Sequence, residues 1–370
     1  MDVVKSVITT IATSGPPFLF VLILVVFFHE LGHFLVARLC GVGVKTFSIG
    51  LGPELFGWFD RHGTRWRIAA VPLGGYVRFV GDDNIASQPD AEELDALTPA
   101  ERDLAFQTKS VGQRAAIVAA GPIANFLLAV VIFTGLVAVT GRLDPTATVG
   151  AVVSGSAAEA ADLRVGDVIV AMEGEPIASF VDIQRIVAPR ADQPTSVVYE
   201  RDGLRHTVTV TPRPRVVEAK DGPQTRGVLG IQRNTLSVGP IEALETGVSN
   251  TWFIAATTGD FLGRLFTGRE SLDQVGGPLR VAKMSGEVAE AGFGPLLNMV
   301  AFLSVSIGMF NLLPVPVLDG GHLAFYLFEA LRGRPVPERV QDVGFRIGLA
   351  LVLMLMSVVL FNDILVVLWK

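Results

Sequence analysis

Four long apolar runs dominate the pattern of hydrophobic and polar positions along the chain. A helix that crosses a bilayer needs about 20 predominantly apolar residues, and each run approaches or exceeds this length. Glycine and proline interrupt the runs, which spans tolerate more readily than soluble helices do. The pattern therefore predicts a polytopic α-helical membrane protein with four spans, at residues 17–39, 115–139, 296–313 and 347–369.

Between the first two spans the pattern changes to short alternating stretches. Residues 44–80 are rich in glycine, aromatic and β-branched residues. Within them, 66–71 and 74–79 predict paired strands joined by a glycine bend. Residues 82–103 are acidic and polar, which indicates a surface loop or a short helix.

A compact α/β stretch is predicted between the second and third spans, at 148–211. Its elements are strands at 149–153 and 168–172, helices at 156–163 and 180–187, and a hairpin of 196–200 with 206–211. Asp202-Gly203 is a typical two-residue hairpin turn. A patch rich in proline and charge, 212–223, is expected to end the unit. Residues 241–266 show an amphipathic helical pattern that suits a membrane surface.

These patterns divide the chain into eight segments. In order, they are a first span at 1–40, a β-loop with a cytoplasmic loop at 41–112, a second span at 113–141, the α/β domain at 142–214, a region with an amphipathic helix at 215–294, a third span at 295–328, a cytoplasmic loop at 329–346 and a fourth span at 347–370.

Composition and charge agree with a membrane protein and exclude other classes. Half of the 370 residues are hydrophobic and 18% are charged, a combination that soluble domains rarely show. The net charge of −6 argues against a nucleic-acid partner. The single cysteine excludes an intramolecular disulfide.

The distribution of arginine predicts the orientation in the membrane. The short loop before the fourth span holds Arg332, Arg334, Arg339 and Arg346, and such loops stay in the cytoplasm. Four spans then place both termini and the α/β domain outside the cytoplasm.

The first span contains His29-Glu30-Leu31-Gly32-His33, an HExxH motif. On a helix the two histidines share one face and can bind one zinc ion, while Glu30 can accept a proton. Each ionisable residue inside a span costs about 2.5–3.5 kcal/mol on insertion scales, so three of them are hard to explain by packing. The alternative is a polar cluster that joins helices. His29 lies roughly 18 Å along the helix from Pro17, past the midplane towards the cytoplasmic face.

A catalytic zinc usually has a third protein ligand. The best source is the segment 311–322, where two prolines break the third span and a glycine pair follows. Broken backbone at membrane depth survives only where it lines a cavity. On chemistry alone Asp319 and His322 compete for the ligand role. Asp60, Asp82 and Asp363 are weaker candidates that better suit solvated or interfacial positions.

At these residues the sequence resembles the site-2 protease family of intramembrane metalloproteases, in particular its bacterial regulator-of-sigma-E protease (RseP) branch. That family carries HExxH in its first span and N-x-x-P-x-P-x-L-D-G in its third, matched here from Asn311 to Gly320. Gly121-Pro122 with Asn125-Phe126, and the stretch 275–278, match as well. The resemblance implies zinc held by His29, His33 and Asp319, with Glu30 as the catalytic residue.

Further expectations follow from this resemblance. It implies that the β-loop is membrane re-entrant, for which the alternative is a simple cytoplasmic hairpin. It also implies that Asn311 and the β-loop residues Gly74, Gly75, Tyr76 and Val77 bind substrate. It implies a PDZ domain at 148–211, where 154–157 and 163–168 match. PDZ grooves bind peptide ends by strand addition. The expected substrates are single-span membrane proteins of the anti-sigma-factor type, or remnant signal peptides.

The expected setting is the bacterial inner membrane, in contact with lipid. There the family performs regulated intramembrane proteolysis, usually after an upstream site-1-type protease has cut the same substrate. Two rival functions are a zinc transporter and an inactive membrane adaptor that acts through its PDZ domain. A transporter needs a continuous polar path, which spans two and four barely supply. An adaptor does not need Glu30.

Overall fold

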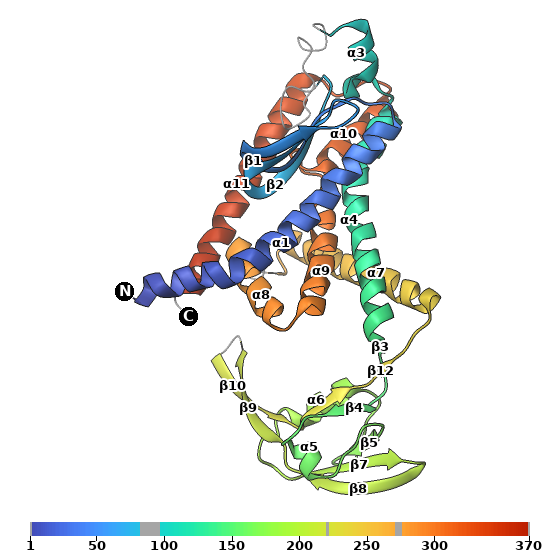
Figure 1. Ribbon diagram of the computed structural model, residues 1–370, viewed down its shortest axis with the longest axis vertical. Coiled ribbons are helices and arrows are strands. Elements are labelled where there is room, and N and C mark those ends of the chain that lie inside the picture. The colour runs from blue at the N-terminus through green and yellow to red at the C-terminus, as the bar shows by residue number, and fades with distance from the viewer. Residues whose placement is uncertain (1, 82–96, 220–221, 271–275, 369–370) are drawn as a thin grey trace. The chain divides into compact units, whose positions relative to one another are not determined.

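The computed structural model describes residues 2–81, 97–219, 222–270 and 276–368 (Figure 1). The chain forms two compact units. The first unit combines Met1–Gly135 with Leu244–Lys370, and the second is Leu136–Ala243. Each unit has its own core.

The first unit is built mainly from helices. They are α1 (Asp2–Leu39), α3 (Pro99–Leu104), a 3-10 turn η1 (Phe106–Thr108), α4 (Val111–Thr140), α7 (Pro240–Phe266), α8 (Pro278–Glu290), α9 (Phe293–Asn311), α10 (Asp319–Arg332) and α11 (Glu338–Leu368). Within the described residues, four of them are long and apolar enough to cross a membrane: Thr13–Leu39, Val111–Thr140, Phe293–Asn311 and Arg339–Ile364. The prediction of four apolar spans is therefore confirmed.

The boundaries of two spans differ from the prediction. Helix α1 begins well before Pro17 and carries Pro16 and Pro17 within it. The predicted loop 329–346 is mostly helical, because α10 continues to Arg332 and α11 already begins at Glu338. The charged residues of this segment are compatible with helix, so they do not mark where α10 ends or α11 begins. Here the break is made by Gly333, in the left-handed conformation at the end of α10, and by the prolines that follow it.

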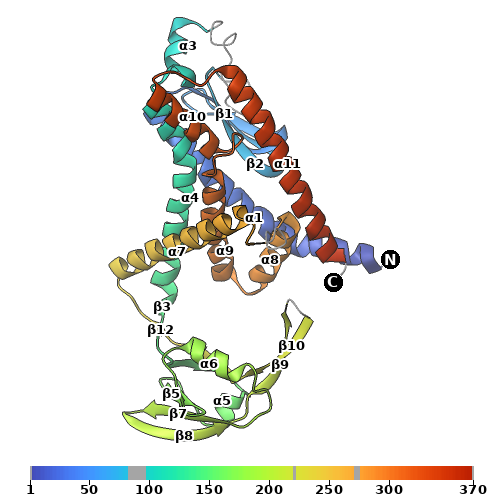
Figure 2. The ribbon, with the colours of Figure 1, turned by 180° about the vertical axis from the view of Figure 1, so that it is seen from behind.

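The long helices pack through apolar side chains. Val21 and Val25 of α1 meet Leu128 of α4 and Val300 of α9 in one buried cluster. The amphipathic helix α7 runs across α4 and α9 (Figure 2) and contributes Ile254 to a second cluster. Its other face leaves large apolar side chains exposed, including Trp252 and Phe253.

Asp363 has a structural role that the sequence did not reveal. It lies on α11 and is only 1% exposed, so a solvated position is wrong. Its carboxylate accepts the backbone N–H groups of Gly277, Leu279 and Arg280, at 3.2, 3.0 and 3.2 Å. These donors lie at the start of α8, where the helix has no internal acceptors for them. Asp363 therefore caps α8 and ties it to the last span.

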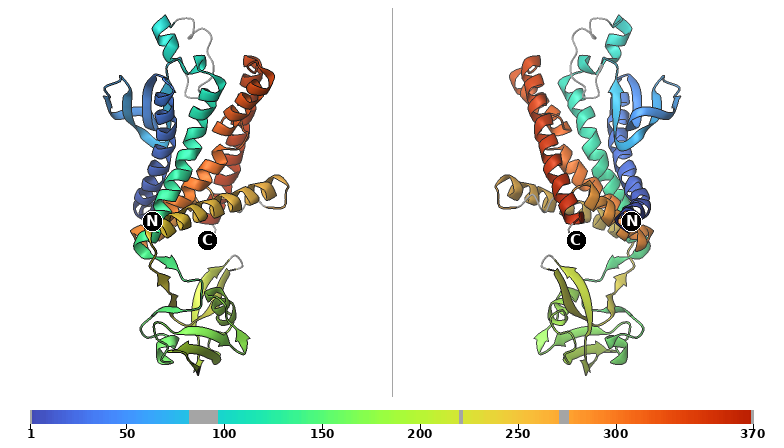
Figure 3. Two further views of the ribbon diagram at one scale, coloured as in Figure 1. Left: turned by 90° about the vertical axis from the view of Figure 1, so that its right-hand side faces the viewer. Right: turned by 90° about the vertical axis from the view of Figure 1, so that its left-hand side faces the viewer.

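The β-loop is an antiparallel sheet formed by two long bent strands, β1 (Val44–Phe59) and β2 (Arg65–Phe79). The first half of β1 pairs on one side with residues 65–68 and on the other with 75–79. Among the residues that the structure describes, this pairing leaves 75–79 as an edge strand. Gly74, with φ of 143°, makes the bend that precedes it. The sheet lies beside α1, on the side away from α11 (Figure 3).

The second unit is a small α/β fold. Its strands are β3 (Arg142–Leu143), β4 (Val149–Val152), β5 (Val168–Met172), β6 (Glu175–Pro176), β7 (Thr195–Arg201), β8 (Leu204–Val210), β9 (Arg213–Ala219), β10 (Gly222–Val228), β11 (Ile231–Arg233) and β12 (Thr235–Leu236). Two helices, α5 (Ala157–Ala160) and α6 (Phe180–Val187), accompany them. A four-stranded sheet has the order β6-β5-β7-β8, and Asp202 and Gly203 make its β7–β8 turn with positive φ.

The second unit extends beyond residue 214, where the sequence predicted its end. The segment 212–223 is not a terminal patch, because most of it belongs to the β9–β10 hairpin. After the hairpin the chain returns, and β11 pairs with β4 while β12 pairs with β3. Leu229 is buried in the core that Ile169, Phe180 and Val197 form. The short helix predicted at 156–163 is confirmed only at Ala157–Ala160.

Candidate metal centre

Helix α1 presents His29 and His33 towards α4, which passes very close. A Cβ on Gly32 would lie 2.7 Å from Ala124 Cβ, and a Cβ on Gly121 would lie 2.5 Å from His33 Cε1. Such distances are too short for any side chain. The two glycines therefore allow α1 and α4 to approach until the imidazoles rest against the α4 backbone.

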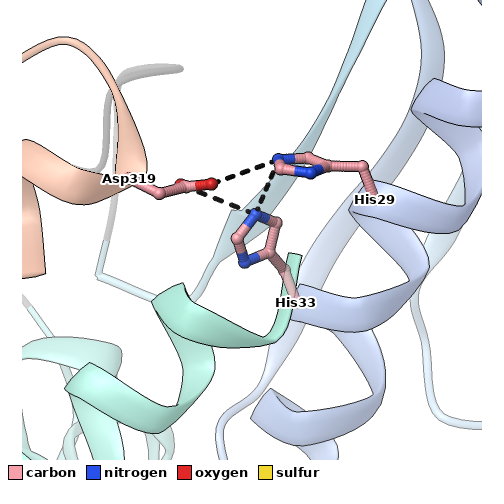
Figure 4. Close-up of side chains that lie close together, drawn as sticks. All are labelled: His29, His33 and Asp319. Carbon is pink, nitrogen blue, oxygen red and sulfur yellow. Dashed lines mark hydrogen bonds and ion pairs between the residues drawn. The ribbon is translucent and has the colours of Figure 1, made fainter. Parts of the chain in front are cut away.

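Asp319 reaches the same place from the other end of the chain. It is the first residue of α10, and the turn after α9 places it there. A Cβ on Gly321 would lie 2.5 Å from Pro316 Cα, so the LDGG glycines fold tightly against the proline-containing segment. Figure 4 shows the Asp319 carboxylate facing both imidazoles.

The three side chains have the spacing of a tetrahedral metal site. His29 Nε2 lies 3.2 Å from His33 Nε2 and 3.2 Å from Asp319 Oδ2, and His33 Nε2 lies 3.6 Å from Asp319 Oδ1. Ligands at about 2.0–2.2 Å from a tetrahedral zinc are about 3.3–3.6 Å apart. Although Asp319 Oδ2 faces His29, this buried oxygen accepts no hydrogen bond from the part of the chain described. Nitrogen and carboxylate donors with a free buried acceptor suit zinc.

Hydrogen bonds behind the ligands orient the imidazoles. His33 Nδ1 lies 2.9 Å from the backbone oxygen of Ile117, so it carries the proton and Nε2 keeps its lone pair. His29 Nδ1 lies 3.3 Å from Nδ2 of Asn125, a residue that is fully buried and whose Oδ1 has no partner among the described residues. Turning the Asn125 amide by half a turn places Oδ1 against Nδ1. Both histidines then point a lone pair at the same position.

Glu30 lies beside the three donors without joining them. Its carboxylate is hydrogen-bonded to the backbone of Val77 in the edge strand of β2. A Cβ on Gly75, in the same strand, would lie 3.0 Å from Glu30 Cγ and 2.8 Å from Val26 Cγ1. The edge strand 75–79 and Glu30 are therefore neighbours, next to the group formed by His29, His33 and Asp319.

The remaining candidates lie elsewhere. His322 is one helical turn beyond Asp319 and outside the three-donor group. Asp60 is held by the backbone N–H groups of His62 and Thr64 and by Trp66 Nε1. Asp82 lies outside the described residues. Asn311 is the last residue of α9, just before the proline-containing turn.

The sequence matches included Asn125 and Gly121 but gave them no role. A signal existed for Asn125, because an asparagine inside an apolar span is costly unless it has a partner. Gly32 also had one, since it lies within the HExxH motif. What could not be read was the closeness of α4, which depends on helix packing.

The fold and the site together define a polytopic membrane protein in which two histidines and one carboxylate are close enough to hold a metal ion. The family model described as "Peptidase family M50" matches residues 17–355. The chain therefore belongs to peptidase family M50, the site-2 proteases, and is a zinc metalloprotease.

Relatives cover nearly the whole chain. A protein of Rhizobium meliloti (strain 1021) named "Putative zinc metalloprotease R01501" is 49% identical over 94% of this chain and 96% of its own length. "Metalloprotease MmpA" of Caulobacter vibrioides is 41% identical, with 94% of each chain covered. A Rickettsia conorii protein named "Putative zinc metalloprotease RC0203" is 34% identical over 94% of this chain and 97% of its own length. The predicted enzyme class and its zinc are confirmed, which rules against an inactive adaptor and a transporter.

Proposed function

We propose that this protein cleaves peptide bonds of membrane-spanning substrates within the bilayer. The observation that carries the proposal is that His29 and His33, on a helix of membrane-spanning length, meet Asp319 at the start of α10, with Glu30 beside them. A peptidase site at this depth suits a substrate that is itself in the membrane. The proposal places the protein in the bacterial inner membrane and in the regulator-of-sigma-E protease branch.

In the proposed mechanism His29, His33 and Asp319 hold the zinc ion. Zinc supplies Lewis-acid chemistry, which acidifies water and polarises the scissile carbonyl. Glu30 is the general base, which takes a proton from the attacking water and returns it to the leaving amine. Because Glu30 is not one of the three donors, its carboxylate is free for this proton transfer.

The substrate is proposed to bind along the edge strand that contains Gly75, Tyr76 and Val77, after the Gly74 bend. An amide inside a substrate helix is blocked by its own hydrogen bonds, so the helix must unwind before attack. An extended segment can then pair with an open strand edge. The hydrogen bond from Val77 to Glu30 supports this position, because a strand added there would run past the catalytic group. Asn311 is proposed as a further partner of the substrate backbone.

We also propose an orientation for the protein and a role for its second unit. The arginines near the start of α11 favour a cytoplasmic position for that end, with the metal centre towards the same side. The second unit is then extracytoplasmic and is proposed to be a PDZ domain. As a filter, it would favour substrates such as anti-sigma factors or remnant signal peptides whose outer domain an upstream protease has already removed.

The proposal is tested with purified protein reconstituted in lipid vesicles together with a tagged single-span protein. We expect cleavage products whose new ends, mapped by mass spectrometry, lie inside the substrate span. A substrate without its extracytoplasmic domain should be cut several-fold faster than the intact one. Cuts confined to soluble loops would contradict intramembrane cleavage, and equal rates for both substrates would contradict the filter.

Replacing Asn125 by leucine is expected to weaken zinc binding by about 10–100-fold, the typical effect of losing a partner behind a metal ligand. Asn125→Asp keeps an acceptor for His29 Nδ1 and should retain nearly full affinity. The measurement is competition with a chromophoric zinc chelator. Asn298→Leu, at an exposed position on α9, is the control. Unchanged affinity in Asn125→Leu would show that His29 does not depend on this amide.

A further inference from the structure

The second unit contains a groove of about 930 Å³ that the zinc chemistry does not use. Apolar side chains of α6 and of the returning chain line it, among them Phe180, Ile183, Val187 and Ile231. The loop 153–157 also contributes to the lining. Among the described strands β11 pairs only with β4, so its other edge is available to an added strand.

The groove is strongly basic although the chain as a whole carries a net charge of −6. Four arginines line it, and none of the described lining residues is an aspartate or glutamate. The arginines are Arg185 on α6 together with Arg213, Arg215 and Arg226 on the β9–β10 hairpin. Among the side chains that the structure describes, Arg185 alone of the four has a carboxylate partner, Glu175 at 3.1 Å, and that pair is exposed.

The arginines of the β9–β10 hairpin lie close enough to repel one another. Arg215 and Arg226 lie directly opposite each other in the β9–β10 register, and Arg213 is on the same face, two residues away. Like charges in directly opposed positions destabilise a strand pair unless an anion lies between them. The hairpin is also held next to the groove, because the Gly227 N–H donates to Ala188 O at 2.9 Å at the end of α6.

If the second unit is the PDZ domain proposed above, its groove takes an extended peptide; resting on that, we propose that the arginines make the groove selective for an acidic segment. Its backbone would add to β11, its apolar side chains would enter the floor formed by α6, and its carboxylates would pair with Arg213, Arg215 and Arg226. In an extended chain, alternate side chains point to opposite sides, so a segment that alternates apolar and acidic residues satisfies both surfaces. The groove would therefore select partners by charge, independently of the protease site.

The test uses the full chain in uncharged detergent, with the Glu30→Gln substitution so that no probe is cleaved. Two fluorescent peptides serve as probes: one alternates valine with glutamate, and the other has glutamine in place of every glutamate. Fluorescence anisotropy should show tighter binding of the glutamate peptide. That preference should shrink as salt is raised, because the screening length falls from about 10 Å at 0.1 M to about 3 Å at 1 M.

Single arginine variants locate the binding site. Arg215→Gln and Arg226→Gln should each weaken the glutamate peptide by about two- to fivefold, the effect of one partly exposed ion pair, and leave the glutamine peptide unchanged. Arg205→Gln is the matched control, since Arg205 lies on β8 and does not line the groove. It should change neither affinity.

Three outcomes would overturn the proposal. The first is equal affinity for the two peptides, or no binding of either. The second is an Arg205→Gln effect as large as that of Arg215→Gln, which would indicate a general charge effect. The third is Arg215-dependent binding of phosphatidylglycerol vesicles without any preference for the glutamate peptide, which would assign these arginines to an anionic lipid surface. None of these outcomes would alter zinc binding or cleavage.

Discussion

Glu30→Gln is expected to abolish peptide cleavage while the protein keeps its zinc. Glutamine has nearly the same shape as glutamate but cannot accept the proton of the attacking water. A general base contributes typically about 10²–10⁴-fold to a rate, so the variant should lose at least this much. Its zinc content should stay at the level of the unchanged protein, because Glu30 lies outside the group formed by His29, His33 and Asp319.

The measurement combines a cleavage assay in lipid vesicles with metal analysis of the same purified sample. Glu245→Gln makes the same chemical change at an exposed position on α7 and should cleave normally. Cleavage by the Glu30→Gln variant at the unchanged rate would refute the assigned role. Loss of zinc together with activity would instead place Glu30 among the groups that hold the metal.

Asp319→Ala should release most of the bound zinc and with it the activity. Only two imidazoles would remain, and the buried site would lose its negative charge. Removing a direct ligand should therefore reduce affinity by more than the 10–100-fold that is typical of an outer partner. The readout is zinc retained after dialysis, together with affinity from chelator competition, so the result does not depend on a cleavage assay.

His322→Ala is the matched control for this experiment. Both residues lie in the first turns of α10, and the sequence alone left them as competing ligands. In the structure only Asp319 approaches the histidine pair. We therefore expect the His322 variant to retain its zinc. The reverse pattern, with zinc lost from the His322 variant and kept in the Asp319 variant, would exchange the two assignments.

Much of the architecture could be predicted because each feature depends on neighbours in the chain. A span is recognised from its own apolar length, and the β7–β8 hairpin from Asp202-Gly203 between alternating strands. The end of the second unit at 214 was predicted wrongly for the opposite reason. Proline and charge in 212–223 resemble a linker, and only the long-range pairing of β11 with β4 shows that the fold continues.

The sequence by itself determined the chemistry of this protein. Two histidines and a glutamate on one helical turn inside an apolar span, with a distant Asn-to-Gly motif, already indicated zinc peptidase chemistry. Tertiary structure decided which groups meet: Asp319 rather than His322 completes the donor set, Asn125 and the glycines of α1 and α4 orient it, and Asp363 caps a helix. These contacts join residues far apart in the chain. Their distances follow from helix packing and tight glycine turns, which no local pattern encodes.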